Sequence, residues 1–199
     1  MFITFEGPDG SGKTTQSKLL YEELRRRGKG VVWTREPGGT DLGRSIRQLL
    51  LDDQNASLAP ETELFLFAAD RAQHVAKVLR PGLAAGQIVL CDRYVDSTTA
   101  YQAGGRGFSA ELIASLNAYS TGGLLPDITF LLDVPSEIGL QRATRQKADK
   151  FEQESLAFHQ KVRAKYLELA AAQTRIHVLD GLQTKEAIFQ QIMARLDML

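Results

Sequence analysis

Gly7-Pro8-Asp9-Gly10-Ser11-Gly12-Lys13-Thr14 is the stretch that decides how this 199-residue chain folds. It follows a short, largely apolar run at residues 1–6 and leads directly into residues 15–21, whose apolar side chains have helical spacing. A glycine-rich loop ending in Gly-Lys-Thr between a strand and a helix is typical of a phosphate-binding P-loop. A chance glycine-rich turn is the alternative, and the strand-loop-helix context argues against it. The sequence therefore predicts a nucleotide-binding site near the N-terminus.

Each residue type in this loop has a physical task. Gly7, Gly10 and Gly12 permit backbone angles that let successive N–H groups point at phosphate oxygens. The helix that begins near Lys13 brings the positive end of its dipole to the same place. Lys13 would donate to the β- and γ-phosphates, and the hydroxyl of Thr14 would be one ligand of Mg²⁺. The loop residues expected to bind the nucleotide are Gly7, Pro8, Asp9, Gly10, Ser11, Gly12, Lys13 and Thr14.

Composition narrows the class of partner. Lys plus Arg and Asp plus Glu both count 24, so the formal net charge is zero and we expect no nucleic-acid partner, which would normally need a basic excess. The single cysteine, Cys91, excludes an internal disulfide and suits a reducing compartment. No apolar stretch approaches the length of about 18 residues that predicts a membrane span, and the N-terminus lacks a signal-peptide pattern. We expect one cytoplasmic domain over residues 1–199, with no membrane partner.

The pattern of apolar runs predicts an α/β fold. Four further strands are expected at residues 30–34, 88–91, 128–134 and 176–180, and helices lie between them. Expected helices include residues 41–51, 60–79, 136–144, 152–172 and 184–196, with one or two more within 96–119 interrupted at 104–107. Pro81 and Gly82 are expected to end the helix over residues 60–79. Five apolar strands separated by helices predict a three-layer fold, a parallel sheet with helices on both faces.

The chemistry should lie where the strands end. Ligands of an open parallel sheet bind outside the carboxyl ends of its strands. Besides the P-loop, the segments at these ends are Arg35-Glu36-Pro37, Asp92-Arg93-Tyr94, Asp133 and Asp180-Gly181. Two of them place arginine beside a carboxylate, as a second phosphate and a metal would require. The Asn-Lys-x-Asp motif of GTP-binding switch proteins is absent, which favours ATP as donor and a phosphate-bearing acceptor.

Four stretches resemble thymidylate kinases of the bacterial kind. They are residues 5–16, Thr34-Arg35-Glu36-Pro37-Gly38-Gly39-Thr40, Asp92-Arg93-Tyr94 and Ala100-Tyr101-Gln102. The likeness extends over essentially the whole chain, and the second and fourth stretches are far more specific than the P-loop. The resemblance implies a P-loop kinase fold with a lid at about residues 142–151 and Mg²⁺-dependent transfer of the γ-phosphoryl group of ATP to dTMP. It also implies a homodimer.

The resemblance further implies roles for individual residues at the acceptor. Asp9 would accept a hydrogen bond from the 3′-hydroxyl of the acceptor sugar. Phe67 and Arg71, four apart and so on one helix face, would stack on thymine and bond its edge. Arg93 would hold the dTMP phosphate, with Arg47 as a weaker second contact.

Three further positions complete the expected site. Asp92 would orient the Mg²⁺ shell or the acceptor, so that the metal site consists of Thr14 and Asp92. Thr98 and Gln102 resemble groups that crowd the sugar and read the base edge, although Ser97 could take the place of Thr98.

The catalytic cation must come from outside the P-loop, because no arginine lies between Gly7 and Gly12. The candidate lid carries four cations, which are Arg142, Arg145, Lys147 and Lys150. Bacterial relatives often have Asp-Arg at the end of this segment, whereas this chain has Asp149-Lys150, and lysine cannot make the bidentate contact of a guanidinium. We expect Arg145 to reach the transferred group and Arg142 to contact ATP, with Arg142 and Lys150 as alternatives to Arg145. The expected catalytic residues are Lys13, Asp9, Arg93, Arg145 and Asp92.

Two rival interpretations remain at this point. A related small kinase for another nucleotide or nucleoside would share the P-loop and Asp-Arg-Tyr, but not the Thr34–Thr40 stretch with Tyr101-Gln102. An ATP-dependent switch or partition protein would hydrolyse ATP slowly without any acceptor, and the second phosphate-binding constellation argues against it.

Overall fold

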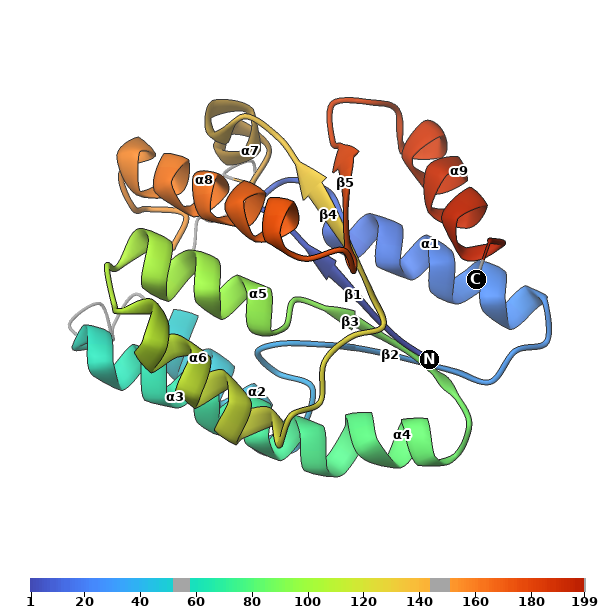
Figure 1. Ribbon diagram of the computed structural model, residues 1–199, viewed down its shortest axis with the longest axis horizontal. Coiled ribbons are helices and arrows are strands. Elements are labelled where there is room, and N and C mark those ends of the chain that lie inside the picture. The colour runs from blue at the N-terminus through green and yellow to red at the C-terminus, as the bar shows by residue number, and fades with distance from the viewer. Residues whose placement is uncertain (52–57, 144–150, 199) are drawn as a thin grey trace.

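A five-stranded parallel sheet forms the centre of the computed structural model, which describes residues 1–51, 58–143 and 151–198. The strand order is β2-β3-β1-β4-β5, so the strand that leads into the P-loop is central (Figure 1). Every neighbouring pair is parallel. The strands are β1 (Phe2–Glu6), β2 (Val31–Arg35), β3 (Ile88–Asp92), β4 (Ile128–Asp133) and β5 (Ile176–Asp180). The predicted five-stranded α/β architecture is confirmed.

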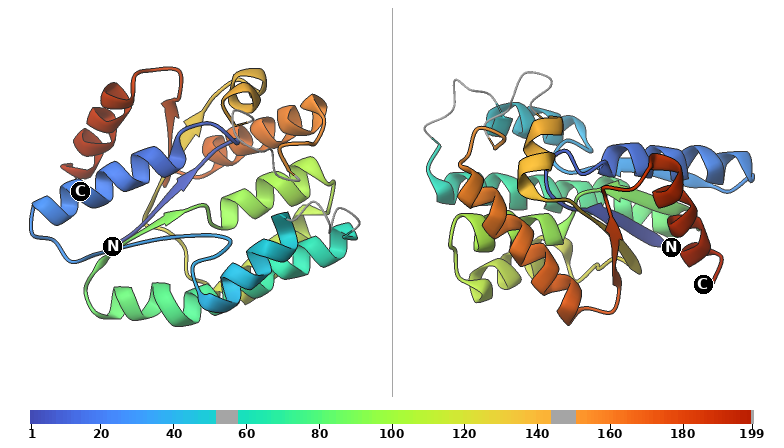
Figure 2. Two further views of the ribbon diagram at one scale, coloured as in Figure 1. Left: turned by 180° about the vertical axis from the view of Figure 1, so that it is seen from behind. Right: turned by 90° about the horizontal axis from the view of Figure 1, so that it is seen from above.

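Helices cover both faces of the sheet because successive strand residues point to opposite sides. Ile3 and Phe5 of β1 lie in a core shared with Leu20, beneath α1 (Lys13–Arg26) and α9 (Lys185–Leu196). Phe2 points to the other face and packs in a second core with Val75. That face is covered by α4 (Arg80–Ala84), α5 (Val95–Thr98) and α8 (Leu156–Ala172), and Figure 2 shows the two layers from above.

The remaining helices surround one end of the sheet. They are α2 (Asp41–Leu51), α3 (Pro60–His74), α6 (Ala110–Thr121), α7 (Ser136–Ala143) and the π-helical segments η2 (Val75–Leu79) and η3 (Thr99–Gly105). Thr40 caps α2, since its hydroxyl accepts a hydrogen bond from the Gly43 N–H at 2.9 Å. In the described ranges, no helix combines the length and apolarity needed to cross a bilayer.

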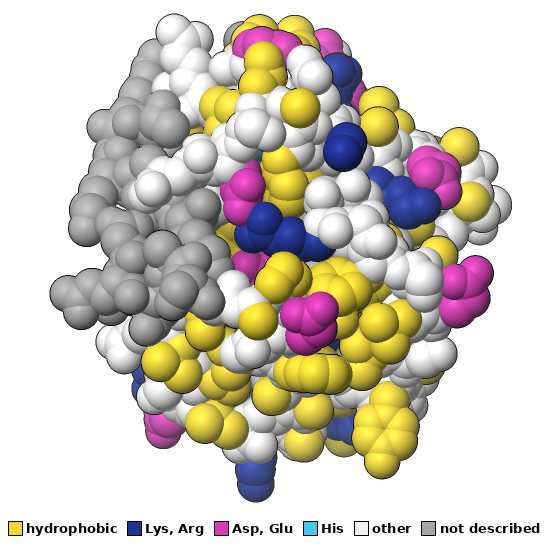
Figure 3. All heavy atoms as spheres, turned by 90° about the vertical axis from the view of Figure 1, so that its left-hand side faces the viewer, with side chains coloured by type: hydrophobic (Ala, Val, Ile, Leu, Met, Phe, Trp, Pro, Cys, Tyr) yellow, Lys and Arg dark blue, Asp and Glu magenta, His cyan; other side chains and the backbone are white. Residues whose placement is uncertain are grey.

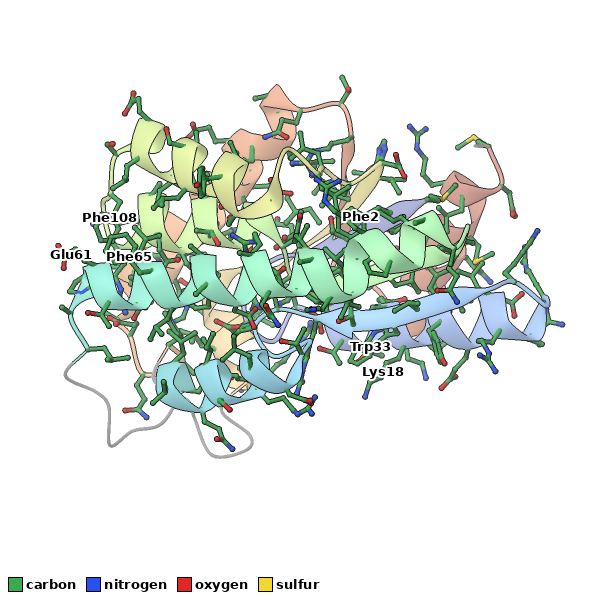
Figure 4. The ribbon with its side chains drawn as sticks, turned by 90° about the horizontal axis from the view of Figure 1, so that it is seen from below. Phe2, Lys18, Trp33, Glu61, Phe65 and Phe108 are labelled. Carbon is green, nitrogen blue, oxygen red and sulfur yellow. The ribbon has the colours of Figure 1, made fainter. Side chains whose placement is uncertain are left out.

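The expectation that Pro81 and Gly82 end the helix that starts at Pro60 is wrong. α3, η2 and α4 follow one another without a break, as one long ribbon in Figure 4. The π-type turn of η2 shifts the hydrogen-bond register, and Pro81 falls in the first turn of α4, where its missing N–H costs no helical bond. The helix ends instead at Ala84, followed by Gly86 with φ of 72°.

α8 crosses η3 at close range and begins later than expected. Its N-cap is Ser155, whose hydroxyl accepts from the Phe158 N–H at 3.2 Å, so the helix starts at Leu156 rather than residue 152. A Cβ placed on Gly105 would lie 2.4 Å from the Phe158 ring, which explains why glycine is needed there. The interruption expected at residues 104–107 lies slightly later. Gly104 and Gly105 still belong to η3, which ends at Gly105, and the break before α6 lies at residues 106–109.

Candidate active site

A cavity of about 860 Å³ lies at the carboxyl ends of β1, β2 and β3, where the parallel sheet predicts a ligand. Figure 3 shows one face of the molecule, where basic and acidic side chains lie side by side near the centre. The expected site residues that line it are Asp9, Gly10, Gly12, Lys13, Thr14, Arg47, Phe67, Arg71, Asp92, Arg93, Thr98, Gln102 and Arg142. Gly7, Pro8 and Ser11 belong to the same loop. Arg145, Lys147 and Lys150 lie outside the described residues.

The P-loop presents backbone to the cavity and touches α7 behind it. Gly12, with φ of 97°, precedes α1, and no side chain caps this helix, so the N–H groups of its first turn remain available to an anion. Gly10 has φ of 69°, and a Cβ there would lie 2.1 Å from the carbonyl oxygen of Gly139 in α7. A Cβ on Gly139 would in turn lie 2.6 Å from the backbone carbonyl oxygen of Asp9. Only glycine at both positions permits this contact between two backbones.

Lys13 is folded back onto the loop. Its Nζ donates to the Pro8 carbonyl at 2.7 Å and to the Ser11 hydroxyl at 3.3 Å. Burial lowers the pKa of Lys13 to about 8, and the positive charge of Arg93 acts in the same direction. The lysine is therefore an ammonium group held in place without a full counter-charge, as a phosphate-binding cation requires.

We expect the kcat/KM for ATP to fall above pH 8. Lys13 is charged below its pKa of about 8 and loses the proton above it, so binding of phosphate to the free enzyme should weaken by about tenfold per pH unit. Bound phosphate raises the pKa of the lysine, and kcat should therefore stay flat over the same range. Initial rates between pH 7 and pH 10 would check this. Parallel falls in kcat and kcat/KM would contradict it.

Thr14 and Asp92 lie together as the expected metal site requires. The Thr14 hydroxyl donates to the Asp92 carboxylate across the start of α1 and the end of β3. A hydroxyl and a carboxylate are the oxygen ligands that Mg²⁺ accepts beside substrate phosphates. The donor set present therefore fits Mg²⁺, although among the described residues no cluster of three or more His, Cys, Asp or Glu side chains could hold a metal without such help.

Arg93 lies at the centre of a charged cluster in the cavity wall. Among described residues other than glycine it alone has φ in the left-handed region, at 71°. Its Nη2 donates to Asp9 Oδ1 at 2.5 Å, and its Nη1 donates to the Gly7 carbonyl at 3.2 Å. Although burial opposes both charges, Tyr101 and Asp9 hold the pKa of Arg93 well above its usual value, and Arg93 holds the pKa of Asp9 below its usual value. Both groups are thus charged.

Tyr101, quoted above only as part of a motif, takes part in this centre. Its hydroxyl donates to Asp9 Oδ2 at 2.6 Å, and the Arg93 guanidinium lies 5.2 Å from its ring centroid. One carboxylate oxygen of Asp9 therefore accepts a hydrogen bond from Arg93, and the other accepts one from Tyr101.

Glu6 supports the Arg93 turn and was missed by the sequence analysis. Its carboxylate is fully buried and accepts from the Tyr94 N–H at 2.7 Å, the Ser97 hydroxyl at 2.6 Å and the Tyr166 hydroxyl at 3.0 Å. Burial, with the nearby Asp96, raises the pKa of Glu6 to about 7. A lone carboxylate at the end of an apolar strand was the available signal, whereas nothing local marked Tyr166.

A second buried cluster anchors Arg71. Glu36 accepts from Arg71 Nε at 2.8 Å and shares a hydrogen bond of 2.8 Å with His74, which shares one of 2.7 Å with Thr34. Arg71 also donates to Thr98 and to the Tyr94 carbonyl, at 2.8 Å and 3.0 Å. Its guanidinium is thus fully engaged by protein, and an incoming base oxygen would have to share one of these donors.

Ser97 and Thr98, between which the sequence could not choose, lie in different clusters. Ser97 lies in the Arg93 cluster, where it accepts from Arg93 Nη1 at 3.2 Å. Thr98 lies in the Arg71 cluster. Both residues line the cavity, and each supports a different arginine.

Replacing Glu36 by glutamine should lower the free energy of unfolding by about 3–5 kcal/mol, because it leaves the buried Arg71 charge without its counter-charge while preserving shape. Glu168→Gln is a matched control, since Glu168 pairs with Lys165 at the surface and is expected to change stability little. Urea unfolding followed by circular dichroism would compare the two variants. Equal unfolding midpoints would contradict the assigned role of Glu36.

The other expected residues lie at the rim of the cavity. Phe67 is half-buried, with its ring centroid 5.8 Å from that of Phe151. Arg47 donates to the Pro37 carbonyl at 3.1 Å, which holds it beside the turn after β2. Arg142 is exposed and donates to the Gly181 carbonyl at 2.9 Å, so it connects α7 with the end of β5.

Comparison with known proteins relates the whole chain to one family. Residues 5–192 match the sequence model described as thymidylate kinase. The thymidylate kinase of Pseudomonas putida (strain GB-1) is 51% identical over 198 residues, covering 98% of this chain and 94% of the relative. That of Solidesulfovibrio magneticus is 49% identical over 201 residues, covering 96% of both chains. The crystal structure of thymidylate kinase from Ehrlichia chaffeensis superimposes with a TM-score of 0.82 at 38% identity, covering 99% of this chain and 98% of that one.

Proposed function

Because the chain belongs to the thymidylate kinase family and phosphorylates dTMP with ATP, we propose that its cavity holds the two nucleotides with their phosphates facing each other. One observation carries this proposal. Lys13 of the P-loop and Arg93 of the turn after β3 face one cavity, near enough for Arg93 to lower the pKa of Lys13. Two cations that repel each other in this way are stabilised when phosphate lies between them.

At the donor end, the P-loop residues Gly7 to Thr14 hold the phosphates of ATP. The N–H groups at the start of α1 and the Lys13 ammonium supply the positive field. Thr14 and Asp92 would hold Mg²⁺, which neutralises charge on the β- and γ-phosphates when it is bound. Arg142, between α7 and the end of β5, contacts the donor nucleotide. Arg145 lies outside the described residues. We assign it the role of stabilising the negative charge that develops on the transferred phosphoryl group, since Arg142, three residues earlier, lines the cavity.

At the acceptor end, Arg93 binds the dTMP phosphate and Arg47 assists it from α2. Asp9, which is ionised beside Arg93, accepts from the 3′-hydroxyl of the sugar. Phe67 stacks on the thymine ring, and Arg71 shares a donor with its edge. Thr98 and Gln102 complete the pocket for sugar and base.

The whole chain acts as one domain that pairs into a homodimer. Residues 142–151 form its lid, and the described ends of this segment, Arg142 and Phe151, both line the cavity. Helices α3 and α6 pack against each other, and each exposes a large apolar side chain that supports the dimer. Phe65 on α3 is 59% exposed and Tyr119 on α6 is 93% exposed. Figure 3 shows hydrophobic side chains gathered on the lower part of its face. The buried thiol of Cys91, which forms no disulfide, suits a protein of the reducing cytoplasm.

A coupled assay of ADP formation tests the function. ATP and Mg²⁺ are supplied with dTMP, dUMP, ribothymidine monophosphate, AMP, CMP or no acceptor. We expect ADP formation to depend on an acceptor and to be greatest with dTMP. Equal ADP formation without an acceptor would support the switch-protein alternative, and preference for another monophosphate would overturn the base-pocket assignments while keeping the phosphoryl-transfer chemistry.

A further inference from the structure

Glu63 of α3 is a buried carboxylate behind the acceptor pocket to which the proposed function gives no role. It is 1% exposed and accepts from three described donors on two side chains. Gln102 Nε2 donates to its Oε1 at 2.8 Å. Arg106 Nε donates to the same oxygen at 3.1 Å, and Arg106 Nη2 donates to Oε2 at 3.2 Å. Glu63 therefore connects a residue of the cavity wall to an arginine behind it.

Arg106 is itself held in place, which keeps Glu63 an acceptor. Its Nη1 donates to Glu154 Oε1 at 2.5 Å, and its guanidinium lies 5.0 Å from the Phe158 ring centroid and 5.7 Å from that of Phe151. A guanidinium has donors only, so the two Glu63 oxygens that face it both act as acceptors.

The orientation of the Gln102 amide follows from this pairing. A glutamine side chain carries a donating nitrogen and an accepting oxygen, which can exchange places by rotation of the amide. Since Glu63 can only accept, the nitrogen must face it, and the carbonyl oxygen must face the other way. Gln102 lines the cavity, and no donor among the described residues reaches its carbonyl oxygen. That oxygen is the polar group that Gln102 offers to a base.

A carbonyl oxygen at this place selects between two classes of pyrimidine. Thymine and uracil carry a donating N–H at ring position 3, whereas cytosine carries an accepting nitrogen there. The Gln102 oxygen would accept a hydrogen bond from the N3–H of thymine or uracil. Opposite cytosine it would face N3, which is also an acceptor, and no hydrogen bond would form. A site built to hydrogen-bond one substrate discriminates strongly against an analogue that leaves its polar group unpaired.

We propose that Glu63 is a specificity-determining residue: it positions Gln102 so that the acceptor pocket takes pyrimidines with an N3–H and rejects 4-aminopyrimidines. This inference rests on the proposed placement of the base against Gln102. Glu63 acts as a positioning residue, because it is separated from the cavity by Gln102 and contacts the base only through it.

Glu63→Met is the decisive variant, because Gln102 and Arg106 Nε share Oε1, and the oxygen of a glutamine at position 63 would still serve both. Methionine removes the acceptor that fixes the nitrogen of Gln102, while Glu154 still pairs with Arg106. The Gln102 amide is then able to turn its nitrogen toward the base, which matches N3 of a 4-aminopyrimidine. The probe is 5-methyl-dCMP, which keeps the methyl group of dTMP and changes only positions 3 and 4 of the ring. We expect the ratio of kcat/KM for dTMP to that for 5-methyl-dCMP to fall roughly 10- to 100-fold, with activity on 5-methyl-dCMP rising.

Glu61→Met is the matched control. It makes the same change one half-turn earlier on α3, where Glu61 is exposed beside Phe65 at the outer end of the helix (Figure 4). Its ratio should equal that of the wild-type enzyme. General loosening of the pocket by Glu63→Met would lower activity on both nucleotides and leave the ratio unchanged, which would overturn the inference.

A second variant covers the case in which Glu63→Met fails to fold. Gln102→Ala removes the group that Glu63 positions, and it should lower the ratio by reducing activity on dTMP alone. An unchanged ratio in this variant would also overturn the inference. A wild-type enzyme that does not use dTMP would instead contradict the proposed function, so the two failures are distinguishable.

Discussion

Replacing Arg93 by methionine is expected to lower kcat/KM for dTMP by about 10³-fold, equivalent to about 4 kcal/mol. Arg93 is the half-buried cation to which we assign the acceptor phosphate, and without it the Asp9 carboxylate would meet that phosphate uncompensated. The left-handed backbone at Arg93 does not complicate the comparison, since methionine has the same conformational preference as arginine. Initial rates at varied dTMP and saturating ATP measure the effect, and the KM for ATP should change little.

Two further variants sharpen this test. Arg93→Lys keeps the charge but cannot bind Asp9 and phosphate as a fork, so we expect a loss between those of the wild type and Arg93→Met. Arg25→Met, on the exposed end of α1, should behave like the wild type. A loss below tenfold in Arg93→Met would show that the acceptor phosphate is held elsewhere.

Replacing Lys13 by methionine is expected to lower kcat about 10²- to 10³-fold with both substrates saturating. The ammonium group is the cation of the P-loop, and phosphoryl transfer depends on charge compensation more than on covalent help from the protein. The variant should also lose the fall in kcat/KM for ATP above pH 8, because the titrating group is gone.

Circular dichroism and the unfolding midpoint would establish that the Lys13→Met protein is folded. Lys29→Met, at an exposed lysine between α1 and β2, provides the matched control with expected wild-type rates. A Lys13→Met enzyme that keeps its turnover but binds ATP weakly would assign the lysine to binding rather than to the transition state.

The parts of this protein that local sequence patterns predict are those whose physics is local. Strand and helix periodicity predicted the five strands, and the rule for open sheets predicted which loops meet at the cavity. The P-loop was identified because its glycines, lysine and threonine perform their tasks within eight consecutive residues. The residues that the resemblance implied, namely Arg47, Phe67, Arg71, Thr98 and Gln102, line the same cavity.

What the sequence could not predict depends on partners distant along the chain. Glu63 and Arg106 are 43 residues apart, and Arg71 and Glu36 are 35 apart, so no spacing rule relates them. Pro81 predicted a helix end because it removes a local hydrogen bond, but the π-type turn of η2 had already changed the register. A buried carboxylate such as Glu6 can be suspected from its position in an apolar strand, yet its partner Tyr166 follows only from the fold.

The contact between Gly10 and Gly139 has a mechanical consequence. Side chains absorb small displacements by changing rotamer, but two backbones in direct contact have no such freedom, and a shift of α7 must move the phosphate loop by a similar amount. The nucleotide cradle and the helix behind it therefore behave as one rigid body. A residue on α7 that never meets a substrate can still set the position of the reacting phosphate, and the precision of the site depends partly on two positions that carry no side chain.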